Sequence, residues 1–185
     1  MVPLSNWKAV MFISRIALAV VCLGAAPPFA AAQEKKPPLV ARDRVQLNLA
    51  GAETVLDAAK KKAAAMGLKC NLAVVDDGGH LLAFARMDGA RPASGATALT
   101  KAVSAATFRQ ETGPLPVKGE PDVLLSLSIQ TASSGKITTL KGGVPIVIDG
   151  QVVGAVGVGG GTGEQDAEIA KAGIQALLDI VSEKK

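Results

Sequence analysis

Two hairpins place the strongest limits on what this chain of 185 residues can fold into. One pairs Cys70–Asp76 with His80–Met87 across a glycine-rich turn, and the other pairs Val144–Ile148 with Gln151–Val158. The second pair is joined by an Asp-Gly dipeptide at 149–150, which readily takes the positive φ angles of a two-residue turn. Hairpins pair antiparallel strands, so the chain should contain an antiparallel sheet.

Four segments predict helices, and one more strand precedes the second hairpin. Apolar residues recur every three or four positions over Asp43–Met66, Gly95–Phe108 and Gly163–Val181. A proline suits the first turn of a shorter helix over Asp122–Thr131, with Ser94 as the predicted N-cap of the helix before it. With Lys136–Leu140 as a strand, the order predicts an α/β fold of the α+β type, in which helices pack against an antiparallel sheet.

The first 32 residues have the features of a secretory signal peptide. Two basic residues accompany an apolar run, Ile16–Ala26, that is too short to span a bilayer, and the Ala30–Ala32 run fits a cleavage site. We expect residues 1–32 to be removed, which leaves a flexible segment over 33–42, a domain over 43–185 and no stable membrane anchor. The protein would then be exported, either periplasmic or secreted. The alternative is an uncleaved N-terminal anchor.

The chain without its first 32 residues carries little net charge. Those residues hold two of the 20 basic side chains and none of the 16 acidic ones, so the net charge falls from +4 to +2 on their removal. The remainder has two Phe and no Trp or Tyr, which leaves little aromatic surface for stacking on bases. We therefore expect no nucleic-acid partner. Cys70 is the one cysteine left, which excludes an intramolecular disulfide and favours a small buried side chain.

His80, the chain's one histidine, and Met87 are candidate ligands for a haem iron, whose axial ligands are usually His, Met, Cys or Tyr. Arg86, Arg91 and Lys101 are the nearest cations in the sequence and could pair with haem propionates or another carboxylate. Simpler alternatives are a solvent-facing His80, a Met87 that only packs, and surface ion pairs. We expect neither zinc nor a nucleophile triad, because one His and one Cys are too few and no G-x-S-x-G motif is present.

A run of three glycines, Gly159–Gly161, separates the last strand from the last helix. It fits neither G-x-G-x-x-G nor a phosphate loop ending in Gly-Lys-Ser/Thr. Thr162 and Gln165 resemble a capping box that opens the helix. Backbone N–H groups at this helix N-terminus could hold a carboxylate, and the alternative is a sharp strand-to-helix turn.

Three motifs lie in order along the chain. They read AVVDDGGHLLAFARMDGA from Ala73, KAVSAATF from Lys101 and GGVPIVIDGQVVGAVGVGGGTGEQDAEIAKAG from Gly142. Together they resemble the GlcG/HbpS family of haem-binding and haem-degrading proteins, over about Asp43 to Val181. The same domain resembles the C-terminal module of some corrinoid adenosyltransferases.

The resemblance implies a profilin-like sandwich with a five-stranded antiparallel sheet, assembly into homo-oligomers such as octamers, and haem as the ligand, with a corrinoid as the alternative. By position, His80 falls in the family's D-x-G-H segment, Arg86 and Met87 in its R-M-D-G-A segment, and Lys101 in its K-A segment. The family often has G-V-S-G where this chain has G-V-G-G at 157–160. The predicted ligand site comprises His80, Arg86, Met87, Lys101, Gly159 and Gly160, with His80 as the iron ligand.

Three functional hypotheses follow. The first is an exported haem-binding protein that acts as a haem-degrading or haem-sensing accessory, with catalysis left open. The second is an enzyme or sensor subunit of the GlcG type for a small carboxylate, held by the glycine turn and nearby cations. The third is a structural subunit whose small-residue surfaces serve only assembly.

Overall fold

The computed structural model of the protein describes Val40 and residues 43–116 and 119–183, which belong to one unit, Val40–Lys185. The predicted signal peptide and most of the predicted flexible segment lie outside the described residues. Within the described part, no helix is long and apolar enough to cross a membrane.

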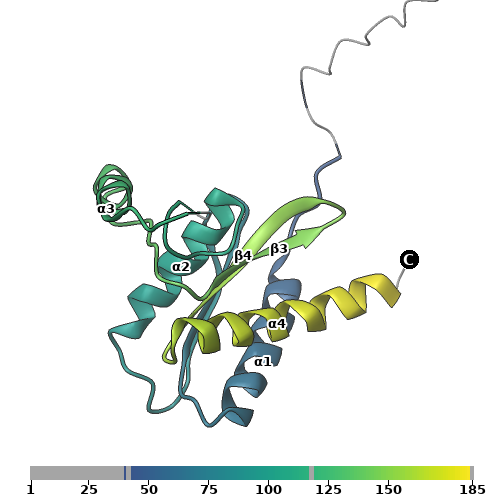
Figure 1. Ribbon diagram of the computed structural model, residues 1–185. Helices are drawn as coiled ribbons and strands as arrows, with labels where there is room; N and C mark the ends of the chain where they lie inside the picture. The colour runs from purple at the N-terminus through teal and green to yellow at the C-terminus, as the bar shows by residue number, and fades with distance from the viewer. Residues whose placement is uncertain (1–39, 41–42, 117–118, 184–185) are drawn as a thin grey trace, which may run out of the picture. The chain divides into compact units, whose positions relative to one another are not determined.

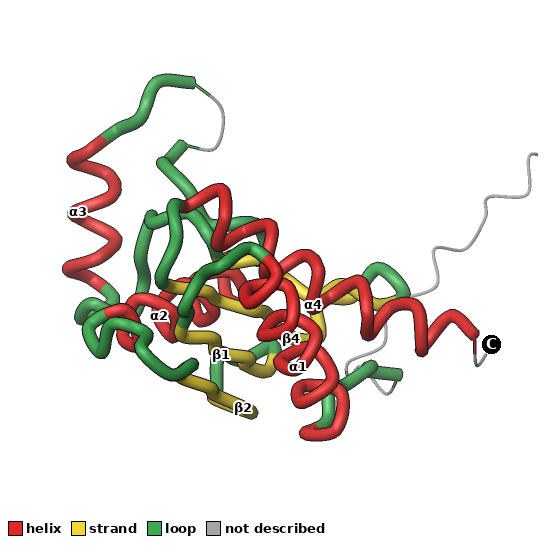
Figure 2. The backbone as a smooth tube through the Cα atoms, turned by 90° about the horizontal axis from the view of Figure 1, so that it is seen from below, coloured by secondary structure: helices red, strands yellow, loops and turns green. Residues whose placement is uncertain are grey.

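Four strands form an antiparallel sheet in the order β2-β1-β4-β3 (Figure 1 and Figure 2). Both predicted hairpins are confirmed. The turn between β3 and β4 has positive φ at Asp149 (49°) and Gly150 (73°), the combination that defines a type I′ turn. The strands are β1, Asn71–Asp76; β2, Leu81–Arg86; β3, Gly143–Ile148; and β4, Gln151–Gly159.

Helices cover both faces of the sheet. On one face α1 (Leu49–Ala65) and α4 (Gly163–Glu183) pack against each other, and α2 (Ser94–Phe108) crosses the other face (Figure 1). α3 (Val123–Ala132) stands apart from the sheet, and none of its residues is buried. The predicted order of helices and hairpins is therefore confirmed.

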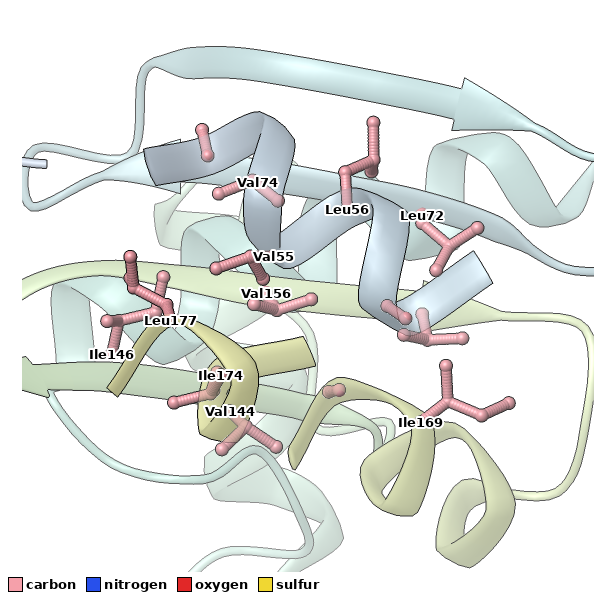
Figure 3. Close-up of a cluster of buried hydrophobic side chains, with 14 of the residues drawn as sticks. Val55, Leu56, Leu72, Val74, Val144, Ile146, Val156, Ile169, Ile174 and Leu177 are labelled. Atoms are coloured by element: carbon pink, nitrogen blue, oxygen red, sulfur yellow. The ribbon is translucent and has the colours of Figure 1, made fainter. Parts of the chain in front are cut away.

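The main core lies between the sheet and the α1–α4 pair (Figure 3). Val55 of α1, Leu72 of β1 and Ile169 of α4 are fully buried in it. Burial of one such aliphatic side chain contributes about 1.5–3 kcal/mol. A smaller cluster under α2, which includes Ala73 and Ala98, is made mostly of alanines. These small side chains let α2 lie close to the sheet.

One predicted strand is wrong. Lys136–Leu140 pairs with no strand, so the sheet has four strands rather than five over the described ranges. Its backbone N–H groups donate to hydroxyls instead, from Thr138 to Ser104 Oγ at 2.8 Å and from Leu140 to Thr138 Oγ1 at 3.2 Å. Hydroxyl acceptors offer the backbone an alternative to a strand ladder.

Two helix starts also differ from prediction. α1 begins at Leu49 rather than Asp43, because the side chain of Asn48 caps it by accepting a backbone N–H from the first turn at 2.8 Å. Ser94 is the first residue of α2 rather than its N-cap, since Ala93 precedes it in a helical conformation and no side chain caps this end.

Candidate functional site

A pocket of about 700 Å³ lies where β4 ends and α4 begins, and we call it the glycine-loop pocket. Its volume is typical of small-molecule sites. The walls come from the start of α2, the turn between β4 and α4, and the segment before β3. The lining includes Arg91, Ser94, Thr97, Lys101, Lys141, Gly159, Gly160, Gly161, Glu164 and Asp166.

Two glycines let neighbouring backbone approach the turn closely. A Cβ on Gly159 would lie 2.6 Å from the carbonyl oxygen of Ser94, and one on Gly160 would lie 2.7 Å from that of Lys69. Both distances are far below van der Waals contact, so a side chain at either position would push backbone apart. The wall of the pocket at this point is therefore bare main chain.

A largely buried ion pair also lines this pocket. Lys101 Nζ is 2.7 Å from Asp166 Oδ2 and donates a second bond to the carbonyl oxygen of Val158 at 2.8 Å. The two side chains are only 6% and 2% exposed. Burying both charges away from water costs free energy unless good geometry and further hydrogen bonds compensate. Here Lys101 has Val158 O as a second partner, and Asp166 accepts a second bond from Gly161 N. The pair joins α2, β4 and α4 at the pocket.

Two backbone N–H groups of the turn, those of Gly161 and Thr162, already have partners within the chain. Gly161 N donates to Asp166 Oδ1 at 2.9 Å. Thr162 and Gln165 form the predicted capping box, with bonds of 2.9 Å and 3.3 Å. A carboxylate of the chain itself, that of Asp166, thus takes up the Gly161 N–H, one of the groups at this helix N-terminus that could hold the carboxylate of a ligand. The side chains that line the pocket are the other groups that can hold one.

Cations stand at the rim of the pocket. Lys141 Nζ pairs with Glu164 Oε1 at 3.1 Å on the exposed side. The pKa of the Glu164 carboxyl lies below its ordinary value because its own backbone N–H and the Lys141 ammonium stabilise the charged form. The guanidinium of Arg91 has no ion-pair partner among the residues described, which leaves it available to an anionic ligand.

His80 lies away from the glycine-loop pocket. It follows the β1–β2 turn beside Asp76, whereas Asn71, at the other end of β1, pairs with Gly159. The ends of a strand of this length are about 17 Å apart. The His80 side chain is 82% exposed, with Nδ1 3.2 Å from the Asp76 carboxylate. Burial raises the pKa of Asp76, but hydrogen bonds from His80 and Gly78 outweigh it and the pKa lies below its ordinary value.

Met87 lines a second pocket of about 590 Å³, which we call the lysine pocket, between the end of α1 and the end of β2. Met87 Sδ accepts the backbone N–H of Cys70 at 3.5 Å, so its thioether is already engaged. Arg86 is exposed and lines neither pocket. The lysine pocket comprises Lys60, Lys61, Ala64, Gly67, Leu68, Lys69, Met87 and Asp88.

The predicted site residues therefore fall in four places. The glycine-loop pocket collects Lys101, Gly159 and Gly160, while Met87 lies in the lysine pocket, Arg86 in neither and His80 at the hairpin turn.

The sequence analysis missed Asp166 as a pocket residue. Acidic side chains are common in the first turn of a helix, so the position of Asp166 after the glycine run was the one available signal of its role.

In the described part of the chain, no group of three or more His, Cys, Asp or Glu side chains could hold a metal ion. Burial, and then the charge of Asp166, raise the pKa of the Cys70 thiol, as expected for an inert buried cysteine.

Comparison with known sequences identifies relatives over this region. The family model "Haem degrading protein HbpS-like" matches residues 47–175. Protein GlcG of Escherichia coli K12 is 39% identical over 117 residues, which are 63% of this chain and 84% of that protein. The corrinoid adenosyltransferase PduO of Salmonella typhimurium is 30% identical over 120 residues, which are 65% of this chain and 35% of that enzyme.

Solved structures show the same fold. The structure of a PduOC:haem complex has a TM-score of 0.63 at 28% identity and covers 71% of this chain and 95% of that one. A double mutant of Streptomyces reticuli HbpS has a TM-score of 0.62 at 29% identity and covers 77% and 98%. The family match over residues 47–175 spans the residues that line both pockets.

Proposed function

This chain belongs to the HbpS-like family of haem-degrading proteins, and we propose that it is an exported protein that binds haem and serves its degradation or sensing. Family membership and the similarity to PduOC, whose structure was solved as a haem complex, support haem as the ligand. The basic and apolar pattern of residues 1–32 supports export. Within the structure, the proposal rests on the cationic rim of the glycine-loop pocket.

That rim suits the acidic edge of haem, a flat apolar molecule with two propionates. Arg91 has no ion-pair partner in the described ranges, and Lys141 pairs only with the exposed Glu164. Arginine binds carboxylates through parallel hydrogen bonds. Of the described residues that line the pocket, none is a His, Met, Cys or Tyr, the usual ligands of haem iron. The pocket therefore fits the carboxylates of haem and offers its iron no usual ligand.

The residues of the pocket then have separate roles. Arg91 and Lys141 bind the carboxylates, and the ion pair between Lys101 and Asp166 fixes the wall against which the ligand lies. Bound haem would supply the redox chemistry of its iron. Lys101 is a positioning residue, because its ammonium group already has two partners within the chain.

His80 is the proposed iron ligand, and its position restricts how it can act. Since it lies at the far end of β1 from the glycine-loop pocket, it could ligate only haem held at the β1–β2 turn or by a second copy of the chain. Its high exposure supports accessibility to such a ligand. A Soret band that is unchanged in His80→Ala would remove His80 from this role, and a shifted band would support it.

Absorption spectroscopy tests haem binding directly. The full chain purified from haem-replete cells, or titrated with haemin, should show a protein-dependent Soret band. Arg91→Gln combined with Lys141→Gln should weaken binding about tenfold, the scale expected for two partly exposed charge pairs. Lys136→Gln combined with Lys171→Gln removes the same charge outside both pockets and should leave binding unchanged. Absence of any haem-dependent band would contradict the proposal.

A small carboxylate is the second candidate ligand. The hydroxyl groups of Ser94 and Thr97 line the glycine-loop pocket beside Arg91 and favour a compact polar anion. Thermal-shift measurements with haem, a corrinoid and short hydroxy acids separate the candidates. Stabilisation by a hydroxy acid, lost in Arg91→Gln, would support this alternative over haem.

We also propose that copies of the chain associate, as the resemblance to the family implies. α3 supports this, because Val123 and Leu124 are 70% and 74% exposed and Leu127 is exposed as well. Light scattering after size-exclusion chromatography measures the subunit number, and a monomer at micromolar concentration would overturn this part of the proposal.

A further inference from the structure

The lysine pocket combines an apolar floor with a basic rim. Ala64 and Leu68, with the side chain of Met87, provide apolar surface between the end of α1 and the end of β2. Gly67 adds no side chain, and a Cβ built there would meet nothing within 4 Å, so the pocket is open at that point. The floor can therefore accept a hydrocarbon body in the volume of about 590 Å³.

The charge of the rim is positive. Three lysines and one carboxylate, Asp88, line the pocket, which gives a net charge of +2. Lys60 pairs with Asp57 at 2.7 Å. Lys61 and Lys69 form no ion pair within the described part of the chain, so their ammonium groups are available to an external anion.

The end of α1 does not compete for these ammonium groups. Its last carbonyls are capped by the chain itself, because Gly67 N donates to Ala64 O at 2.9 Å and Leu68 N donates to Ala63 O at 2.9 Å. A cationic ligand would therefore find few free acceptors here, whereas an anion would find two unpaired lysines.

We propose that the lysine pocket is a second binding site, separate from the glycine-loop pocket, for an apolar molecule that carries a carboxylate. The hydrocarbon part lies on Leu68 and Met87, and the carboxylate binds Lys61 and Lys69. A fatty acid and the propionate edge of a porphyrin share this chemistry. The proposal does not depend on haem binding in the glycine-loop pocket.

Main chain divides the two pockets. A Cβ built on Gly160, which lines the glycine-loop pocket, would lie 2.7 Å from Lys69 O and 3.0 Å from Cys70 Cα. The backbone of Lys69 and Cys70 thus lies directly against Gly160 of the glycine-loop pocket, while Lys69 itself lines the lysine pocket. Variants of the rim of one pocket can therefore be tested against ligands of the other.

Titration calorimetry of the full chain tests the proposal with four probes: dodecanoate, acetate, dodecyltrimethylammonium and metal-free protoporphyrin IX. We expect binding of dodecanoate or protoporphyrin, and none of acetate or the ammonium compound, because both the apolar body and the negative charge are needed. Lys61→Gln combined with Lys69→Gln should weaken binding about tenfold. The matched pair Lys136→Gln and Lys171→Gln should bind as the unchanged protein does.

A second variant places a carboxylate on the floor. Ala64→Glu changes an exposed helical position to another good helix former, so the fold should be retained, as circular dichroism would verify. It should abolish binding of dodecanoate, and any protoporphyrin binding that the Lys61 and Lys69 variant weakens, while the Soret titration at the glycine-loop pocket is unaffected. If dodecanoate binds Ala64→Glu and the Lys61 and Lys69 variant as tightly as it binds the unchanged protein, the proposal is overturned. It is also overturned if the unchanged protein binds neither carboxylate probe. Binding of dodecanoate alone would identify a fatty acid as the ligand class, and binding of protoporphyrin alone would identify a porphyrin.

Discussion

The ammonium nitrogen of Lys101 lies 2.7 Å from a carboxylate oxygen of Asp166, although 65 residues separate them along the chain. Lys101 projects from α2 and Asp166 from the first turn of α4, so the ion pair joins helices that pack on opposite faces of the sheet. Since both side chains are almost fully buried, loss of either partner leaves a charge in the interior without compensation.

Removal of the Lys101 charge should therefore destabilise the protein strongly. We expect Lys101→Met to lower the free energy of unfolding by about 3–5 kcal/mol, because Asp166 is then buried without a counter-ion. Adding Asp166→Leu should restore part of the loss, since no unpaired charge remains. Urea denaturation followed by circular dichroism measures both. Lys141→Gln, which breaks an exposed pair, is the control and should leave the midpoint nearly unchanged. A Lys101→Met midpoint equal to that of the control would contradict the assigned role.

The turn after β4 should tolerate no side chain at Gly160. Its φ of 154° and the 2.7 Å approach of a Cβ to Lys69 O predict that Gly160→Ala costs about 1–3 kcal/mol of unfolding free energy. Gly113→Ala is a matched control, because a Cβ there meets nothing within 4 Å and φ is not positive. Thermal unfolding of the two variants compares them, and equal melting temperatures would show that the backbone at Gly160 can move aside.

The hairpins could be predicted because their signals are local. The Asp-Gly turn at 149–150 and the glycine-rich turn before His80 each lie within a few residues of the strands that they join. Lys136–Leu140 has a strand-like pattern but no strand partner. The hydroxyl that bonds Thr138 N comes from Ser104, 34 residues away, and no local pattern shows such a contact.

The site was predictable only in part for a similar reason. Lys101 and Gly160 were expected to act together, and the structure places both at one pocket. His80 and Met87 are close in sequence, but the extended strand between them carries them about 20 Å apart. Asp166 looked like an ordinary first-turn acid, and only tertiary packing reveals its bond to Lys101.

The Asp76 carboxylate should make stability depend on pH in acid. Its folded pKa lies below the ordinary value of 3.8, so its hydrogen bonds with His80 and Gly78 contribute fully above that value. The contribution is lost as the pH falls through the lower folded pKa. We expect the melting temperature to drop below about pH 4 and to drop less in Asp76→Asn. Identical acid profiles of the two proteins would show that the carboxylate is not held by these bonds.

The Cys70 thiol should report on opening of the pocket wall. Cys70 is fully buried and burial raises the pKa of its thiol, so a thiol reagent should reach it only when the structure opens. In a Cys22→Ser background, native protein should react far more slowly than urea-unfolded chain. Lys101→Met should speed the reaction about a hundredfold, the factor that corresponds to about 3 kcal/mol when opening is global. If the native protein reacts as fast as the unfolded chain, this wall is open to solvent. If Lys101→Met leaves the reaction rate unchanged, Cys70 is exposed by a local movement that does not depend on the ion pair.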